Sequence, residues 1–202
     1  TFLRTINTTA VHAESLLNDA SLLTRLEREG GAFPLEPVNI GEIATDVGDM
    51  FGGMAAKKRV KIIFMNTAAG RVQGNKTALR QVLVNLVSNA VKYNRDGGKV
   101  WIRFDEGNGW TELSITDEGS GVHHDDLSRI FEKFYRAAGS ERQKGAGLGL
   151  YIVKLLTEAM GGKITVASSP GAGSTFTVSF QKQNTLDAEE AGEKNTGDCA
   201  LG

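Results

Sequence analysis

Residues whose types and spacing could do chemistry lie along one edge of a helix expected over residues 79–94. Asn85, Asn89 and Lys92 are four and three residues apart, which places them on one side of an α-helix with Tyr93 beside them. Amide oxygens can coordinate Mg²⁺, and a Lys ammonium pairs with phosphate as a point charge. The pattern therefore indicates a site for a polyanion and its metal ion, and a solvated helix face is the alternative.

Three glycine-rich segments follow this helix. Asp117 opens the sequence Asp-Glu-Gly-Ser-Gly after a strand expected over 111–116, and Gly171 opens another segment before a strand expected over 174–180. Gly145, Gly147 and Gly149 lead into an apolar helix expected over 148–160, where unpaired N–H groups and the helix dipole favour an anion. Each segment alone is typical of an ordinary turn, so the prediction of a ligand site depends on the order and spacing of all of them.

Together these motifs resemble the catalytic, ATP-binding domain of sensor histidine kinases, within the gyrase, heat-shock chaperone, histidine kinase and mismatch-repair ATPase superfamily. The resemblance extends over about residues 33–181. The matching motifs are an N box (Asn85–Tyr93), a G1 box (Asp117–Gly121), an F box (Ile130–Arg136), a G2 box (Gly145–Gly149) and a closing glycine motif (Gly171–Phe176).

The resemblance implies ATP and Mg²⁺ as ligands, with Asn85 and Asn89 holding the metal ion and Asp117 accepting a hydrogen bond from the adenine amino group. It implies that Asn85, Lys92 and Arg136 act in phosphoryl transfer, and that residues 137–144 form a mobile lid. Hydrolysing relatives carry a carboxylate at the position of Asn85, so an amide there favours transfer to a His. The remaining nucleotide contacts are expected from Tyr93, Gly119, Gly121, Lys144, Gly145, Gly147, Leu148, Gly149 and Thr175.

The chain is expected to have three parts: residues 1–32, 33–182 and 183–202. Residues 1–29 carry a coiled-coil seam and resemble the second helix of a histidine kinase dimerisation domain, which implies a homodimer in the parent protein. The phosphoacceptor His is then expected upstream of this chain, and His12 is interpreted as a solvated or interface residue. The resemblance implies that residues 33–182 form the catalytic domain, and residues 183–202 are expected to form a flexible acidic tail.

The expected fold is α/β (α+β), a two-layer sandwich of the Bergerat type with three main helices on one face of a mixed sheet of about five or six strands. A helix over 40–57 is expected to bury Ile43, Val47, Met50, Phe51 and Met54. Strands are expected over 60–65 and 71–73, and hairpins over 100–116 and 163–180. Asp125 is expected to cap a short helix over 126–134, and the segment 33–39 is interpreted as an extended linker.

Composition limits the partners and the compartment. The 23 basic and 24 acidic residues nearly balance, which gives no reason to expect a nucleic-acid partner, and a single Cys suits a reducing compartment. No apolar run reaches the about 18–20 residues that span a bilayer, so a soluble, cytoplasmic kinase portion is expected, with membrane attachment only through missing upstream segments. The resemblance implies a response-regulator receiver domain as partner. Two alternatives are a non-catalytic nucleotide-binding scaffold and a Ser/Thr kinase of the anti-sigma-factor type.

Overall fold

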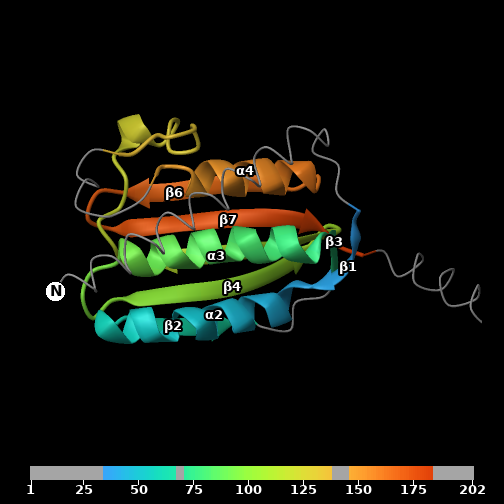
Figure 1. The fold of residues 1–202 in the computed structure, drawn as a ribbon, viewed down its shortest axis with the longest axis horizontal. Coiled ribbons are helices and arrows are strands. Elements are labelled where there is room, and N and C mark those ends of the chain that lie inside the picture. Colours follow the sequence, from blue (N-terminus) through green and yellow to red (C-terminus); the bar gives the residue numbers. More distant parts are fainter. Residues whose placement is uncertain (1–33, 67–70, 138–145, 184–202) are drawn as a thin grey trace, which may run out of the picture.

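Three helices cover one face of a five-stranded sheet in the computed structural model, which describes residues 34–66, 71–137 and 146–183 (Figure 1). The expected helix 1–29 with His12, the lid over 137–144 and the acidic tail lie outside the described residues, apart from Ala137 and Gln183. No helix within the described ranges is long and apolar enough to cross a membrane. The elements are β1 (Glu36–Asn39), α2 (Ile40–Lys57), β2 (Lys61–Met65), β3 (Arg71–Gly74), α3 (Lys76–Lys92), β4 (Lys99–Gly107), β5 (Trp110–Asp117), η1 (His124–Asp126), α4 (Gly149–Ala159), β6 (Lys163–Ser169) and β7 (Gly173–Gln181).

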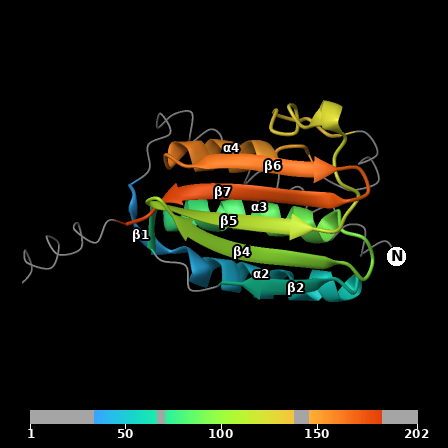
Figure 2. The ribbon, with the colours of Figure 1, turned by 180° about the vertical axis from the view of Figure 1, so that it is seen from behind.

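The main sheet has the strand order β2-β4-β5-β7-β6. β2 runs parallel to β4 and the other neighbours are antiparallel, so the sheet is mixed, as predicted. Both expected hairpins, β4–β5 and β6–β7, are present. Figure 2 shows the sheet from its other side, with the helices behind it. The predicted two-layer α/β sandwich with three main helices is confirmed.

α3 is the central helix, and it packs between α2 and α4. It begins three residues before the predicted start because the Asn75 side chain accepts a hydrogen bond from the N–H of Ala78 at 3.1 Å and caps the first turn. The apolar stripe expected from the sequence is buried at every position: Leu79, Val82, Leu83, Leu86, Val87, Ala90 and Val91. Burial of this stripe turns the opposite edge, which carries Asn85 and Asn89, away from the sheet.

α2 has the predicted bounds, but the prediction of its buried side was wrong at two positions. Met50 and Met54 are 51% and 44% exposed. The helix packs on the sheet through Ile43, Val47 and Gly48, and the Phe64 ring of β2 occupies the space beside Gly48. A residue without a side chain at position 48 lets helix and sheet approach closely, and the buried side of α2 that includes it leaves the two methionines on the outer face.

The segment interpreted as a linker contains a strand. β1 pairs with β3 in a separate two-stranded sheet, with Val38 opposite Val72. Val72 also forms a bridge to Lys182, and the N–H of Gln183 donates to the carbonyl of Arg71 at 3.0 Å. The first and last described segments are therefore joined at one end of the main sheet.

The helix predicted over 126–134 is wrong. Only a single 3₁₀ turn, η1, is present, and its cap is His123, whose ring accepts from the N–H of Asp125 at 3.4 Å. The chain then continues in turns, because Phe134 has a φ of 66° and donates its N–H to the carbonyl of Gly147 at 3.0 Å. Tyr135 closes the loop by donating to the Asp126 carboxylate at 2.6 Å, which raises the pKa of the Tyr135 hydroxyl.

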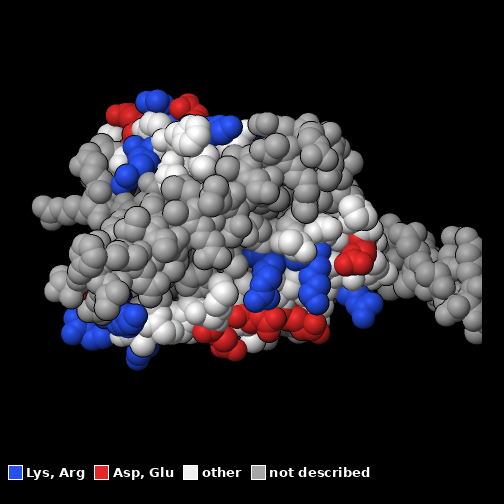
Figure 3. Space-filling view, in the orientation of Figure 1, with Lys and Arg blue, Asp and Glu red and all other residues white. Residues whose placement is uncertain are grey.

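The helical face carries charges of both signs (Figure 3). Exposed acidic side chains follow α2 at Glu42, Asp46 and Asp49, and Arg80 of α3 lies 3.4 Å from the Asp46 carboxylate. An exposed pair of this kind contributes little to stability, because water screens it.

Candidate functional site

The Asn85 side chain of α3 faces the first turn of α4. Its Oδ1 lies 3.4 Å from the position that a Cβ on Gly149 would occupy. The first N–H groups of a helix have no partner within the helix, and the α4 cap residue Leu148 supplies no side-chain acceptor for them. The Nδ2 atom of Asn85 is buried without a hydrogen-bond partner among the described residues. The Asn85 amide thus lies beside the start of α4, and the N–H groups of that helix end suit an anionic ligand.

The end of α3 adds a cation and an aromatic ring. Lys92 is the last residue of the helix and Tyr93 is its cap, with the Lys92 Nζ 4.8 Å from the centre of the Tyr93 ring. Asn89, Lys92 and Tyr93 are half-buried. The edge predicted from the spacing therefore leads from Asn85 to the carboxyl end of the helix.

Asp117 is a buried carboxylate at the end of β5, only 6% exposed. It accepts hydrogen bonds from the N–H of Gly119, at 2.7 Å, and from the N–H of Ser174. Burial raises the pKa of this carboxyl above its usual 3.8, and the two N–H donors oppose the shift by stabilising the charged form. A carboxylate has about four lone-pair sites, so acceptor capacity remains for a ligand.

The turn after β5 lies directly against the end of α3. The N–H of Ser120 donates to the Tyr93 carbonyl at 3.3 Å. Gly119 lies so close to the Tyr93 carbonyl that a Cβ would collide with it. The absence of a side chain at position 119 is what allows Asp117 and Tyr93 to share one small region.

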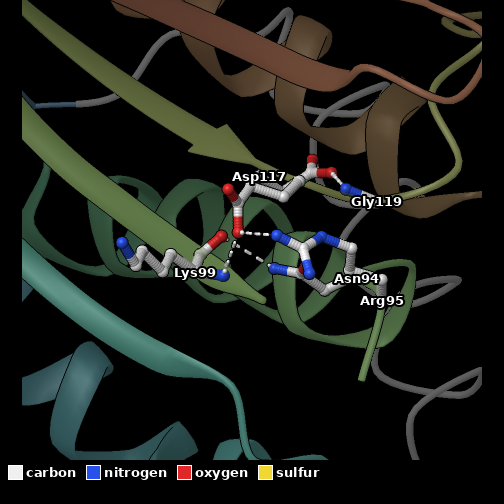
Figure 4. A network of polar contacts seen from close by, with 6 residues as sticks. Asn94, Arg95, Lys99, Asp117 and Gly119 are labelled. Atoms are coloured by element: carbon white, nitrogen blue, oxygen red, sulfur yellow. Dashed lines mark hydrogen bonds and ion pairs between the residues drawn. The ribbon is translucent and has the colours of Figure 1, made fainter. Parts of the chain in front are cut away.

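A polar network around Glu118 holds the same turn from the other side. The Glu118 carboxylate accepts from the Arg95 guanidinium at 2.9 Å and from the N–H of Lys99 at 3.0 Å. Asn94 donates to the carbonyl of Lys99 at 2.9 Å. Figure 4 shows Asn94, Arg95 and Lys99 grouped beside Asp117 and Gly119. The connection between α3 and β4 is thereby joined to the turn that carries Asp117.

Gly121, Gly147 and Leu148 are three further predicted residues that the structure describes. The two glycines have φ values of 66° and 72°, and Leu148 is buried at the start of α4. Arg136 is exposed near the end of the described range 71–137, whereas Lys144 and Gly145 lie outside the described residues.

Thr175 is not brought together with these residues. Its hydroxyl lies 2.9 Å from that of Thr116. Because side chains alternate along a strand, Thr116 and Thr175 lie on the sheet face opposite to that of the buried Ile115 and Phe176. The neighbouring Ser174 lies opposite Asp117 in the ladder, and its N–H contacts the carboxylate. Sequence reasoning missed Ser174, although the alternation of β7 from the buried Phe176 could have identified it.

The described residues contain no cluster of three or more His, Cys, Asp and Glu residues able to hold a metal ion. His123 and His124 contact only the exposed Asp125 among carboxylates. Mg²⁺ commonly binds through one or two protein oxygens together with water and substrate phosphates. The amide oxygens of Asn85 and Asn89 fit that mode of binding, since they lie at the same edge as the space before α4.

The buried Asp117 carboxylate near the end of α3, together with the start of α4, on a mixed sheet covered by three helices, is compatible with a nucleotide-binding domain. The chain belongs to the family of histidine kinase-, DNA gyrase B- and HSP90-like ATPases, whose pattern matches residues 74–184. Within that family it is the ATP-binding catalytic portion of a sensor histidine kinase.

Known proteins of this class cover most of the chain. It is 34% identical over 185 residues to the aerobic respiration control sensor protein ArcB of Escherichia coli strain K12, a match covering 89% of this chain and 24% of ArcB. Full-length ShkA in complex with AMPPNP superposes with a TM-score of 0.75 at 30% identity, covering 91% of this chain and 39% of ShkA. Histidine kinase ThkA in complex with the response regulator TrrA has a TM-score of 0.71 at 21% identity over 91% of this chain and 52% of ThkA, which shows the fold alone. The chain spans about a quarter of the length of ArcB.

Proposed function

We propose that this chain transfers the γ-phosphate of ATP to a His side chain of a dimerisation domain, for relay to an Asp of a response regulator. The observation that carries the proposal is the Asn85 amide, whose buried Nδ2 has no partner among the described residues and which faces the start of α4. A triphosphate between α3 and α4 would meet that amide and the first N–H groups of α4.

Adenine recognition is assigned to the other side of the site. Asp117 would accept a hydrogen bond from the 6-amino group of adenine, where guanine carries a carbonyl oxygen, and Tyr93 would line the base. A Cβ on Gly119 or Gly121 would collide with the carbonyl of Tyr93 or Ser169, so both glycines let the backbone pack closely beside Asp117, and the N–H of Ser174 orients the carboxylate. Selection of adenine thus depends on one buried acceptor that the protein holds with its own N–H groups.

Phosphoryl transfer depends mainly on positioning and charge stabilisation. Asn85 and Asn89 would hold Mg²⁺, which supplies positive charge at the phosphates. The N–H groups of Gly147 and Gly149, with the side chains of Lys92, Arg136 and Lys144, would stabilise negative charge on the phosphates. A His nitrogen would attack the γ-phosphorus as the bond to the β–γ bridging oxygen breaks, and ADP leaves.

The amide at position 85 favours transfer over hydrolysis. An Asn side chain does not accept a proton from water at neutral pH, so Asn85 cannot act as the base that activates a water molecule. A neutral imidazole is itself a nucleophile and needs no such base.

The partners and the division into domains extend this proposal. Residues 1–32 would supply one helix of the dimerisation domain of a homodimer, residues 33–182 the kinase domain, and residues 183–202 a tail. ThkA, which has the same fold, forms a complex with the response regulator TrrA. The kinase portion would operate in the cytoplasm.

Calorimetric titration with ADP and GDP, with and without Mg²⁺, tests the nucleotide site. We expect saturable ADP binding that Mg²⁺ strengthens and a clear preference for ADP over GDP. Asp117→Asn should weaken ADP by about tenfold and leave GDP nearly unchanged. Equal loss of both nucleotides would contradict the adenine role of Asp117, and no binding at millimolar ADP would refute the nucleotide site and favour a scaffolding module that does not bind nucleotide.

A further inference from the structure

Lys58 is the cap residue at the end of α2, and its side chain reaches the end of a different helix. The half-buried ammonium donates to three main-chain carbonyls at the end of α3: Val91 at 3.2 Å, Lys92 at 2.8 Å and Asn94 at 2.8 Å. None of the motifs described above contains Lys58.

The chemistry of the two groups matches. An ammonium has three N–H donors, and here three carbonyl oxygens accept them. The last carbonyls of a helix have no partner within the helix, and that end carries the negative pole of the helix dipole. A lysine at this position therefore satisfies the free carbonyls and stabilises the last turn of α3.

Main-chain hydrogen bonds also join the residues after α3 to the segment around Lys58. The N–H of Gly97 donates to the carbonyl of Lys58 at 2.9 Å, and the N–H of Lys61 donates to the carbonyl of Gly98 at 3.0 Å. The connection between α3 and β4 is thus held at both ends by the segment that joins α2 to β2.

Residues 93–98, which these hydrogen bonds hold, include Tyr93 on the adenine side of the proposed site. Tyr93, between two residues whose carbonyls bind Lys58, offers its own carbonyl to the N–H of Ser120 at 3.3 Å. Gly119, beside Ser120, donates to Asp117 at 2.7 Å. A displacement of the Tyr93 carbonyl would therefore move the turn that orients the Asp117 carboxylate.

We propose that Lys58 is a positioning residue for adenine recognition, acting through the last turn of α3 and the Tyr93 carbonyl on the turn that holds Asp117. The proposal rests on the proposed function of the nucleotide site. Lys58 belongs to neither the proposed base contacts nor the proposed phosphate contacts, and its effect falls on the adenine side and not on the proposed metal ligands Asn85 and Asn89.

Lys58→Met tests this role, because it keeps the length of the side chain and removes the donors. Lys57→Met is the matched control, since Lys57 is the neighbouring exposed lysine in the last turn of α2. We expect Lys58→Met to raise the Kd for ADP by roughly five- to tenfold, to reduce the preference for ADP over GDP, and to leave the strengthening by Mg²⁺ unchanged. Lys57→Met should bind as the wild type does, and Lys58→Arg should recover most of the affinity, since a guanidinium also donates to several carbonyls.

Binding stoichiometry separates positioning from simple loss of folded protein. A purely structural role would lower the fraction of binding-competent molecules, while the remaining molecules would keep the wild-type Kd and selectivity. That result, or a wild-type Kd in Lys58→Met, would overturn the proposal.

Amide hydrogen exchange without nucleotide makes the test independent of ligand binding. In Lys58→Met the N–H groups of Gly119 and Ser120 should exchange faster than in the wild type, while the buried strand residues Leu113 and Ile115 keep their protection. Unchanged exchange at Ser120 would overturn the proposal. Failure of the wild-type chain to bind ADP would refute the proposed function and would leave the exchange result to decide the position of the turn.

Discussion

Two glycines in the turn between β6 and β7 provide a sharp test of how the backbone holds the site. Gly171 and Gly173 have φ values of 76° and 85°, which L-residues with a side chain rarely adopt. A Cβ on Gly171 would meet nothing within 4 Å. A Cβ on Gly173 would collide with the Asp117 carbonyl oxygen and lie 2.8 Å from its carbonyl carbon.

The difference between the two sites sets the expected magnitudes. A left-handed conformation costs an L-residue about 1–2 kcal/mol, and Ala in place of Gly recovers about 0.4–1 kcal/mol by restricting the unfolded chain. Gly171→Ala should therefore lower the free energy of unfolding by about 1 kcal/mol or less. Gly173→Ala must also displace the backbone of Asp117, an overpacking cost of about 1–3 kcal/mol, so its total should be about 1–4 kcal/mol.

Urea denaturation of both variants and of the wild type measures these free energies, and calorimetry with ADP measures the consequence at the site. Gly173→Ala should also weaken ADP, because the residue it displaces carries the adenine acceptor, whereas Gly171→Ala should bind normally. Equal destabilisation of the two variants would refute the argument that the contact with Asp117 explains the glycine at position 173.

Three further predictions concern Asp117 and Asn89. Burial raises the pKa of Asp117, so the carboxylate should be protonated at a pH above the ordinary 3.8 and then lose an acceptor site for adenine. ADP affinity should therefore fall on acidification in that range. Titrations over a pH series should show this fall in the wild type and not in Asp117→Asn. Between 3.8 and the raised pKa the folded chain binds more protons than the unfolded chain, so without nucleotide the free energy of unfolding should decrease as pH rises through that interval, which urea denaturation across that pH range measures. Asn89→Ala should remove about tenfold of the Mg²⁺-dependent ADP affinity, while binding without Mg²⁺ stays near that of the wild type; an unchanged Mg²⁺ effect in calorimetry would rule out Asn89 as a metal ligand.

The elements predicted well are those in which the spacing of apolar residues along the sequence matches the spacing of buried residues in the structure. All seven apolar positions of α3 are buried, because a three- and four-residue repeat has one geometric solution on a helix. The two main-sheet hairpins are marked by alternation and by glycines at their turns. Met50 and Met54 lie outward because the buried side of α2 runs through the small residues Ala44, Gly48 and Ala55, which a search for large apolar side chains does not identify.

The errors share a physical origin in contacts between distant segments. β1 is a strand because β3 pairs with it, and Pro34 and Pro37 indicate only an extended chain. The segment 126–134 fails to form a helix because Phe134 donates to Gly147 and Tyr135 donates to Asp126. At the site, spacing placed Asn85 on the right edge, but it gave no sign that Lys58 reaches the end of α3.

The two-stranded sheet of β1 and β3 brings the two ends of the described chain together. Asn39 pairs with Arg71, whose carbonyl accepts from the N–H of Gln183 at 3.0 Å. The N–H of Lys182 donates to the carbonyl of Gly109, in the turn before β5. Asp117 is at the opposite end of this eight-residue strand, about 24 Å from that turn at about 3.4 Å per residue. The proposed adenine acceptor therefore lies far from Gln183, and a fluorescent label placed at Gln183 would report on the chain end without contacting the nucleotide.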